Sequence, residues 1–288
     1  MREEDKQFFE FLFEMIEEKI TTYHNVAHRG VGPDAQLIAH LTSQEVEGLF
    51  NCVKTLFKNT SPKGISPAIF NRVFSEIEQY AYLEHIRDEA GYLISPNNVH
   101  NKTHTRVQNQ LAKLGSFRRV TSTGAFQNSY SQLAHDSYEI AHRVLQLAKE
   151  LTQDPEAKVD PQFEEEFGHG FKMMRALAKP GQHYQVPKTK KKIDNLHTEC
   201  TLFLALSKKQ GFKKSSTVLT PKQAINDKTR HLAKLARLRD QLEKLQSQPE
   251  EIQSSACCSS TLFYKRAAIT TVTTVAVGLT AMAVRGWG

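Results

Sequence analysis

Histidines at helical spacing are the first residues of this sequence that could bind a metal. The chain has twelve histidines, and two pairs are four residues apart, His24 with His28 and His100 with His104. That spacing places both rings of a pair on one face of a helix, as a zinc site requires. A hydrolytic zinc site would also carry a general-base glutamate after the first histidine, but asparagine stands there in both pairs. We predict ordinary core or surface histidines, with no metal and no other cofactor.

A second possible metal-binding set combines His104 with the doublet His135-Asp136, in the stretches HTRVQNQLAKL and QLAHDSYEIAH. These stretches resemble the HD superfamily of metal-dependent phosphohydrolases, in which a helical histidine, a later His-Asp doublet and a distant aspartate bind metal. The resemblance implies that Asp160 or Asp194 is the last ligand. Helical geometry argues against it, because at 100° per residue His135 lies about 160° from the centre of its helix's apolar face, and Asp136 about 100°. We expect the doublet to face solvent unless another helix covers it, and keep the phosphohydrolase as an alternative function.

The four cysteines form no evenly spaced framework, which indicates a reducing compartment. His197 and Cys200 are three residues apart on an apolar helix. A nucleophilic cysteine needs a nearby base or positive charge, and such pairs are usually assembled from distant segments, so we predict a buried structural thiol at Cys200. Cys257 and Cys258 precede an apolar tail and are candidates for palmitoylation, with two plain linker thiols as the alternative.

Lysines gather after residue 180, in and beyond the stretch PKTKKK. Eight of them form a candidate surface for anionic partners: Lys188, Lys190, Lys191, Lys192, Lys208, Lys209, Lys213 and Lys214. The net charge of +7 also favours anionic partners. Few aromatic side chains lie between the lysines, so nucleic acid is not expected and anionic lipid is preferred. The same stretch resembles a nuclear-localisation run, and a solvated loop is the alternative.

Most of the chain has the apolar periodicity of helices, and no strand pattern precedes the tail. Predicted helices cover about residues 3–28, 42–58, 66–91, 95–115, 125–152 and 162–178. The first has an aromatic apolar face, which we assign to core or partner packing. Thr42 with Glu45 predicts a capping box, and Ser66-Pro67 predicts the next helix start. The fold class is therefore all-α, with a multi-helix bundle over residues 1–180.

Three further regions follow the bundle. Residues 181–220 form a basic region with a short buried helix near 193–207, residues 221–248 an amphipathic helix, and residues 249–260 a linker. Leu235, Leu238, Leu242 and Leu245 make two heptads, fewer than a sustained coiled coil needs. We favour a helix lying on the bundle, with a paired coil, and hence a homodimer, as the alternative.

The chain ends on an uncharged run of eighteen residues, with Ala267 first and Val284 last, between basic flanks. A helix of that length spans about 27 Å, near the thickness of a hydrocarbon core. Five threonines and Gly278 weaken the apolar character, and a buried helix or a strand are the alternatives. We predict that residues 261–288 are a membrane anchor, with Val275 near the middle of a transmembrane helix.

Only RGWG follows this run, an arrangement that resembles the general plan of tail-anchored proteins. The resemblance implies a helical body on the cytosolic face of an intracellular membrane. A short, modestly apolar span favours the mitochondrial outer membrane or the endoplasmic reticulum, and a soluble cytoplasmic protein is the alternative. We expect a non-enzymatic interaction or adaptor protein, which presents helical surfaces to a protein partner at that membrane.

Overall fold

The structure is a computed structural model that describes residues 1–29, 35–61, 63–94, 98–119, 129–178, 186–213 and 221–247. The chain divides into two units, Met1–Asp240 and Gln241–Gly288. The first unit is the helical body. Of the second unit, the structure describes residues 241–247, which are the last residues of a helix.

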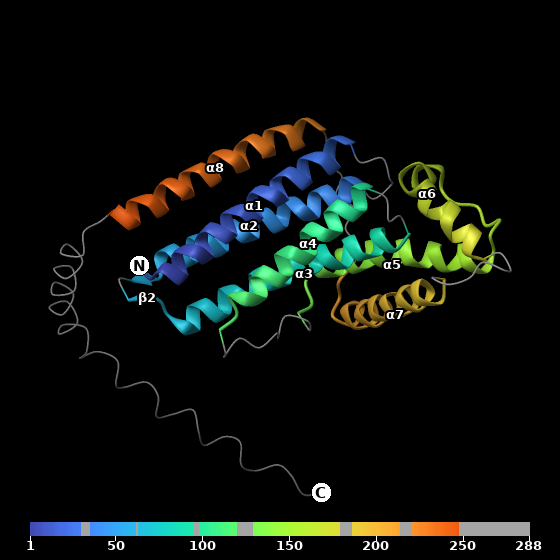
Figure 1. The fold of residues 1–288 in the computed structure, drawn as a ribbon, viewed down its shortest axis with the longest axis horizontal. Helices are drawn as coiled ribbons and strands as arrows, with labels where there is room; N and C mark the ends of the chain where they lie inside the picture. Colours follow the sequence, from blue (N-terminus) through green and yellow to red (C-terminus); the bar gives the residue numbers. More distant parts are fainter. Residues whose placement is uncertain are drawn as a thin grey trace, which may run out of the picture. The chain divides into compact units, whose positions relative to one another are not determined.

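The described residues are mostly helical, so the all-α prediction is confirmed (Figure 1). The elements are α1 (Glu3–Arg29), α2 (Ala35–Lys58), β1 (Thr60–Ser61), β2 (Gly64–Ile65), α3 (Pro67–Ile94), α4 (Asn98–Ser116), α5 (Gln132–Gln153), α6 (Pro161–Ala178), α7 (Val186–Lys209) and α8 (Pro221–Ser247). The two strands form a minimal antiparallel hairpin between α2 and α3.

The aromatic face of α1 is buried, as predicted for core packing. Its apolar residues are at most 3% exposed: Phe8, Phe9, Phe11, Leu12, Phe13, Met15, Ile16, Ile20 and Tyr23. The ring of Phe8 lies 4.9 Å from that of Phe70 in α3, and the ring of Phe9 stacks 4.6 Å from that of Phe57 in α2. Aromatic side chains bury large areas, so these contacts fix α1 against its neighbours.

A second apolar cluster joins the C-terminal half of α3 to α5, α6 and α7. Its members include Leu83, Ile86, Ala90, Ala141, Leu145, Ala148, Phe167, Phe171, Cys200, Phe203 and Leu204. Helix α5 packs closely against both α3 and α7 (Figure 1). Because α5 is covered on two sides, polar residues away from its main apolar stripe are also buried.

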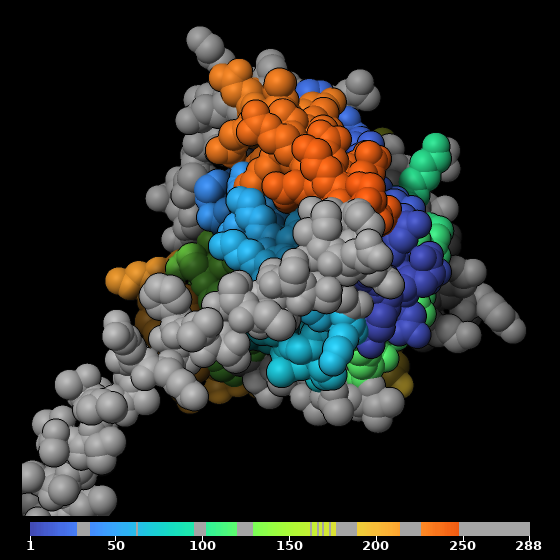
Figure 2. All heavy atoms as spheres, turned by 90° about the vertical axis from the view of Figure 1, so that its left-hand side faces the viewer, coloured from blue at the N-terminus to red at the C-terminus, as the bar shows by residue number. Residues whose placement is uncertain are grey.

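Helix α8 lies against α1 and α2 in the part up to Asp240, and Figure 2 shows it in orange over the two blue helices. Glu47 of α2 contacts Nε2 of His231 at 3.0 Å and Nζ of Lys234 at 2.5 Å. Leu235 and Leu238, which share a face with His231, are 2% and 4% exposed. The favoured prediction, a helix lying on the bundle, is confirmed for this part, and nothing described supports a coiled coil.

Helix starts were predicted with mixed success. The backbone N–H of Ile69 donates to Oγ of Ser66, which confirms the cap before Pro67. The capping box at Thr42 and Glu45 is wrong, because α2 already begins at Ala35 and Thr42 lies inside it, donating to the carbonyl of Ile38. A serine or threonine can form such a bond within a helix, so the pattern alone does not mark an end.

Asp5 ties the start of α1 to two distant segments. Its fully buried carboxylate accepts hydrogen bonds from Arg2, from Arg119 at 2.7 Å and from the backbone N–H of Ile65 at 3.1 Å. Burial alone would raise the pKa of Asp5, but these donors outweigh it and lower the pKa. Gly64 approaches the same carboxylate with φ of +93°, and a Cβ there would collide with Arg2 and Asp5.

Candidate functional site

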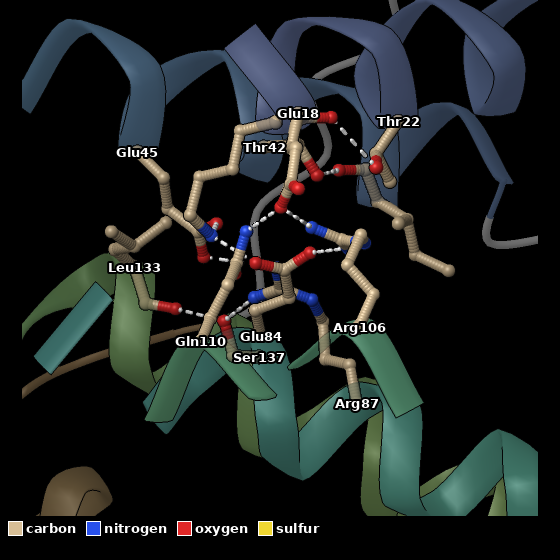
Figure 3. A network of polar contacts seen from close by, with 12 residues as sticks. Glu18, Thr22, Thr42, Glu45, Glu84, Arg87, Arg106, Gln110, Leu133 and Ser137 are labelled. Atoms are coloured by element: carbon tan, nitrogen blue, oxygen red, sulfur yellow. Dashed lines mark hydrogen bonds and ion pairs between the residues drawn. The ribbon is translucent and has the colours of Figure 1, made fainter. Parts of the chain in front are cut away.

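A network of buried charged side chains lies where α1, α2, α3 and α4 meet (Figure 3). At its centre is Lys19, which is fully buried. Its Nζ contacts Oε2 of Glu45 at 3.0 Å and also contacts Glu84. Burying an ammonium group costs several kcal/mol unless carboxylates compensate it, and here two of them do.

Two arginines extend the network. Arg87 Nη2 lies 2.8 Å from Glu45 Oε1, and its Nη1 donates to Oγ of Ser137 in α5 at 2.6 Å. Arg106 of α4 pairs with Glu84, and its Nη1 lies 3.8 Å from Glu18. Lys19, Arg87 and Arg106 thus balance Glu18, Glu45 and Glu84. With formal charge cancelled inside the protein, this network is suited to holding helices in register.

Glu84 shows the strength of this compensation. Burial acts to raise its pKa, but Lys19 and Arg106 outweigh burial and lower it to about 2. Periodicity and capping patterns do not predict this network, because Glu45 fits a helix cap equally well. The available signal was a charged residue inside an apolar stripe: Lys19 falls between Ile16 and Ile20 at helical spacing.

Asp88 lies beside this network and faces His104. Burial and the charge of Glu84 raise its pKa to about 7. Nδ1 of His104 is 3.4 Å from Asp88 Oδ2 and 3.3 Å from Glu89 Oε2, and the His104 ring stacks on Tyr92 at 4.1 Å. Asp88 is therefore partly protonated at neutral pH, and no hydrogen bond joins its Oδ2 to Nδ1 of His104.

The doublet His135-Asp136 is buried, so its predicted exposure to solvent is wrong. His135 is 1% exposed and Asp136 is 2% exposed. The helical-wheel argument assumed one covered face of α5, whereas α7 packs on the side that carries His135. The imidazole Nδ1 lies 2.7 Å from Oγ of Ser207 in α7.

The structure places the other residues of the phosphohydrolase set elsewhere. His104 is in α4 and faces α3, and its described contacts do not include His135 or Asp136. Asp194 is in α7 and pairs with Lys149 at 3.4 Å, while Asp160 directly precedes α6. These described contacts do not assemble the set, and the phosphohydrolase stays an alternative without support from them.

Cys200 is buried, as predicted. Burial and the charge of Glu199 raise the pKa of its thiol to about 12, so the thiolate is strongly disfavoured at neutral pH. Nε2 of His197 contacts the side-chain oxygen of Gln146 at 2.8 Å, and its ring stacks on His142. The pair is therefore arranged for packing and hydrogen bonding, not for nucleophilic chemistry.

Helix α7 separates the predicted lysines into two groups. Lys190, Lys191 and Lys192 lie near its start, whereas Lys208 and Lys209 end it and Lys213 follows. A helical rise of 1.5 Å per residue puts Lys191 and Lys209 about 27 Å apart along the axis. The side chain of Lys188, and all of Lys214, lie outside what the structure describes.

Between these lysine groups, α7 exposes apolar side chains. The predicted buried helix is buried on one face only: Ile193, Cys200, Phe203 and Leu204 point inward. Leu202 and Leu206, one turn apart on the outer face, are 61% and 46% exposed, and Leu232 of α8 is 40% exposed. At 100° per residue, Lys191 and Lys209 share the side of Leu202 and Leu206. We call these four residues the α7 outer face. The sequence indicates this exposure through the run CTLFLAL, which is apolar around more of the helix than one buried face can cover.

No described helix combines the length and the apolarity that a bilayer-spanning segment requires. The predicted anchor, including Ala267, Val275, Gly278 and Val284, lies outside the described residues, as do Cys257 and Cys258. Comparison of the chain with protein-family models, curated proteins and solved structures gives no match.

Proposed function

We propose that this protein is a non-enzymatic interaction protein of a membrane surface, whose α7 outer face lies against anionic lipid. In this proposal the C-terminal tail holds the chain at the membrane, and the remaining helical surface is available to a protein partner. The observation that carries the proposal is the exposure of Leu202 and Leu206 between two groups of lysines on one helix.

The chemistry of the α7 outer face suits the interface of a bilayer. Leucines on an interfacial helix enter the boundary between headgroups and acyl chains, while lysines beside them reach anionic phosphates. Each lysine near such a surface contributes about 1 kcal/mol. Two leucines supply little area, so we expect the α7 outer face to orient a protein that a second attachment retains.

The described polar clusters support a non-enzymatic role. The network around Lys19 balances its own charge, and the Cys200 thiol has a raised pKa. Neither arrangement leaves an activated nucleophile or a general base at a surface cavity. These two clusters therefore favour a binding role over a catalytic one.

Binding of the full chain to vesicles tests the α7 outer face. We expect stronger co-sedimentation with phosphatidylserine-containing vesicles than with pure phosphatidylcholine. Replacing Leu202 and Leu206 by Glu should abolish that difference, whereas Leu232→Glu, at a leucine of α8 that is 40% exposed, should leave it. Alanine at Lys188, Lys190, Lys191 and Lys192 should weaken anionic binding about fivefold for each lysine that reaches the surface. Equal binding of all variants would refute the assignment.

Extraction with alkaline carbonate tests the tail separately. Val275→Arg places a charge at the predicted middle of the span, at a cost of about 3 kcal/mol. We expect the variant to be extracted from membranes, and Leu232→Arg in the body to remain as tightly held as wild type. Complete extraction of the wild-type protein would refute the membrane anchor, but it would leave the proposed role of the α7 outer face untouched.

A further inference from the structure

Three potential metal ligands meet on one turn of α5, away from the α7 outer face. Each of His135, Asp136 and Glu139 offers a ligand atom, and these atoms lie within 4.8 Å of one another. His135 and Asp136 are almost fully buried, while the Glu139 side chain is 25% exposed. The group is thus enclosed on the protein side and open to water at Glu139.

The hydrogen bonds of His135 determine which of its nitrogens is available. Oγ of Ser207 donates to the carbonyl of Leu204 at 3.1 Å, and a hydroxyl has only one proton to donate. The imidazole Nδ1 lies 2.7 Å from the same Oγ. If Ser207 keeps its proton on the Leu204 carbonyl, it accepts from Nδ1–H, and the neutral imidazole then carries its lone pair on Nε2.

That lone pair faces a carboxylate. Nε2 of His135 lies 3.7 Å from Oε2 of Glu139, farther than a hydrogen bond. Two electron-pair donors at this separation match two ligands of one cation, since each would sit about 2.0–2.2 Å from a zinc ion.

The surroundings of the cluster resemble the supporting shell of a metal site. Ser207 fixes the imidazole tautomer and ring orientation, as partners of metal-binding histidines do. The amide of Gln132 donates to Oδ1 of Asp136 at 2.8 Å, which orients that carboxylate. One residue from α7 and one from the preceding turn of α5 therefore hold two of the ligands in place.

We propose that His135 Nε2 and the carboxylates of Asp136 and Glu139 bind a divalent transition-metal ion. One imidazole and two carboxylates suit Zn²⁺ or Mn²⁺, and water completes the coordination on the open side. The ion has a structural role. Through the contact of Ser207 with His135, it strengthens the attachment of α7 to α5. This site is independent of the proposed membrane function.

Titration of the full-length chain with metal tests the proposal. After treatment with EDTA and removal of the chelator, calorimetry with ZnCl₂ or MnCl₂ should show a site that raises the melting temperature. Glu139→Gln and Asp136→Asn should each weaken binding at least about tenfold. Ser207→Ala, at a positioning residue, should weaken it less and shift the tautomer of His135 in nitrogen-detected NMR.

Glu89→Gln is the matched control, because Glu89 also faces a histidine at 3.3 Å. It should leave the affinity unchanged. Binding that is absent, or equal in wild type and Glu139→Gln, would overturn the proposal. So would a metal-free spectrum that places the neutral proton of His135 on Nε2, because that nitrogen would then have no lone pair for a metal ion.

Discussion

The network around Lys19 and the cluster around His135 are two ways of burying polar groups in one helical body. The Lys19 network draws its charges from four helices, and its contacts join residues as far apart as Lys19 and Glu84. The His135 cluster takes its three ligands from a single turn of α5. The first therefore depends on correct packing of the whole bundle, whereas the second depends on local helix geometry.

Helix α5 contributes to both. Ser137 points to Arg87 of the network, and His135, two residues earlier and about 200° away around the helix, points to Ser207 of α7. The difference suggests a division of roles. Long-range charge pairs within the chain specify how helices assemble, and a local set of ligands can take up an ion after assembly.

The largest effect should come from removing the central cation. Lys19→Met leaves Glu45 and Glu84 buried without their shared partner, so we expect a loss of about 3–5 kcal/mol in the free energy of unfolding. Chemical denaturation measures it. Lys113→Met removes an exposed pair with Glu14 and should cost no more than about 1 kcal/mol. Similar losses for both variants would contradict the role assigned to the network.

Asp88 should give an intermediate effect that depends on pH. Its pKa is raised to about 7 on folding from an ordinary 3.8. The native state therefore binds more protons than the unfolded chain between about pH 4 and 7, and stability falls as pH rises through that window. The asparagine of Asp88→Asn cannot ionise, so the stability of this variant should not fall in that window. Its free energy of unfolding, compared with that of wild type, should be about 1–3 kcal/mol more favourable at pH 8 than at pH 4.

Denaturation curves across that pH range measure the effect. Glu89→Gln, at the neighbouring carboxylate, should keep the pH dependence of wild type. If Asp88→Asn follows the wild-type curve, then the pKa of Asp88 is not raised in the native protein.

The smallest effect should come from the His135 cluster without metal. Glu139→Gln changes one partly exposed side chain, so we expect less than about 0.5 kcal/mol in EDTA. With metal at a hundred times the wild-type dissociation constant, wild type should gain about 2.7 kcal/mol, and the tenfold weaker variant no more than about half of that. A large loss in EDTA would indicate that the Glu139 side chain stabilises the protein without metal, and would contradict the contrast with the Lys19 network.

The apolar periodicity of the sequence was enough to predict the helices and the buried face of α1. The start of α3 was also predictable, because Ser66 and Pro67 act through local geometry. Glu45 and His135 were misplaced for the opposite reason. Their positions depend on Lys19, 26 residues away from Glu45, and on Ser207, 72 residues away from His135. A helical wheel places a residue on one helix and cannot show that a second helix covers the other face.

The exposure of Leu202 and Leu206 was hidden by the same limit. The run CTLFLAL is apolar all round, a pattern that usually indicates complete burial. Among the described residues, α5 and α3 cover one side of α7. The apolar run therefore includes exposed leucines as well as buried residues. The lysines form a group in the sequence, yet the length of α7 separates them in space.

Asp5 has a consequence for how the first part of the chain could be rearranged. By binding Arg2, Ile65 and Arg119 at once, it makes the beginning of α1 and the residues just after α4 neighbours. Segments whose two ends adjoin tolerate circular permutation and insertion into host proteins, because a short connection can bridge them. The two ends of residues 1–119 therefore lie close together at the Asp5 carboxylate, and a short linker could join Arg119 to Met1.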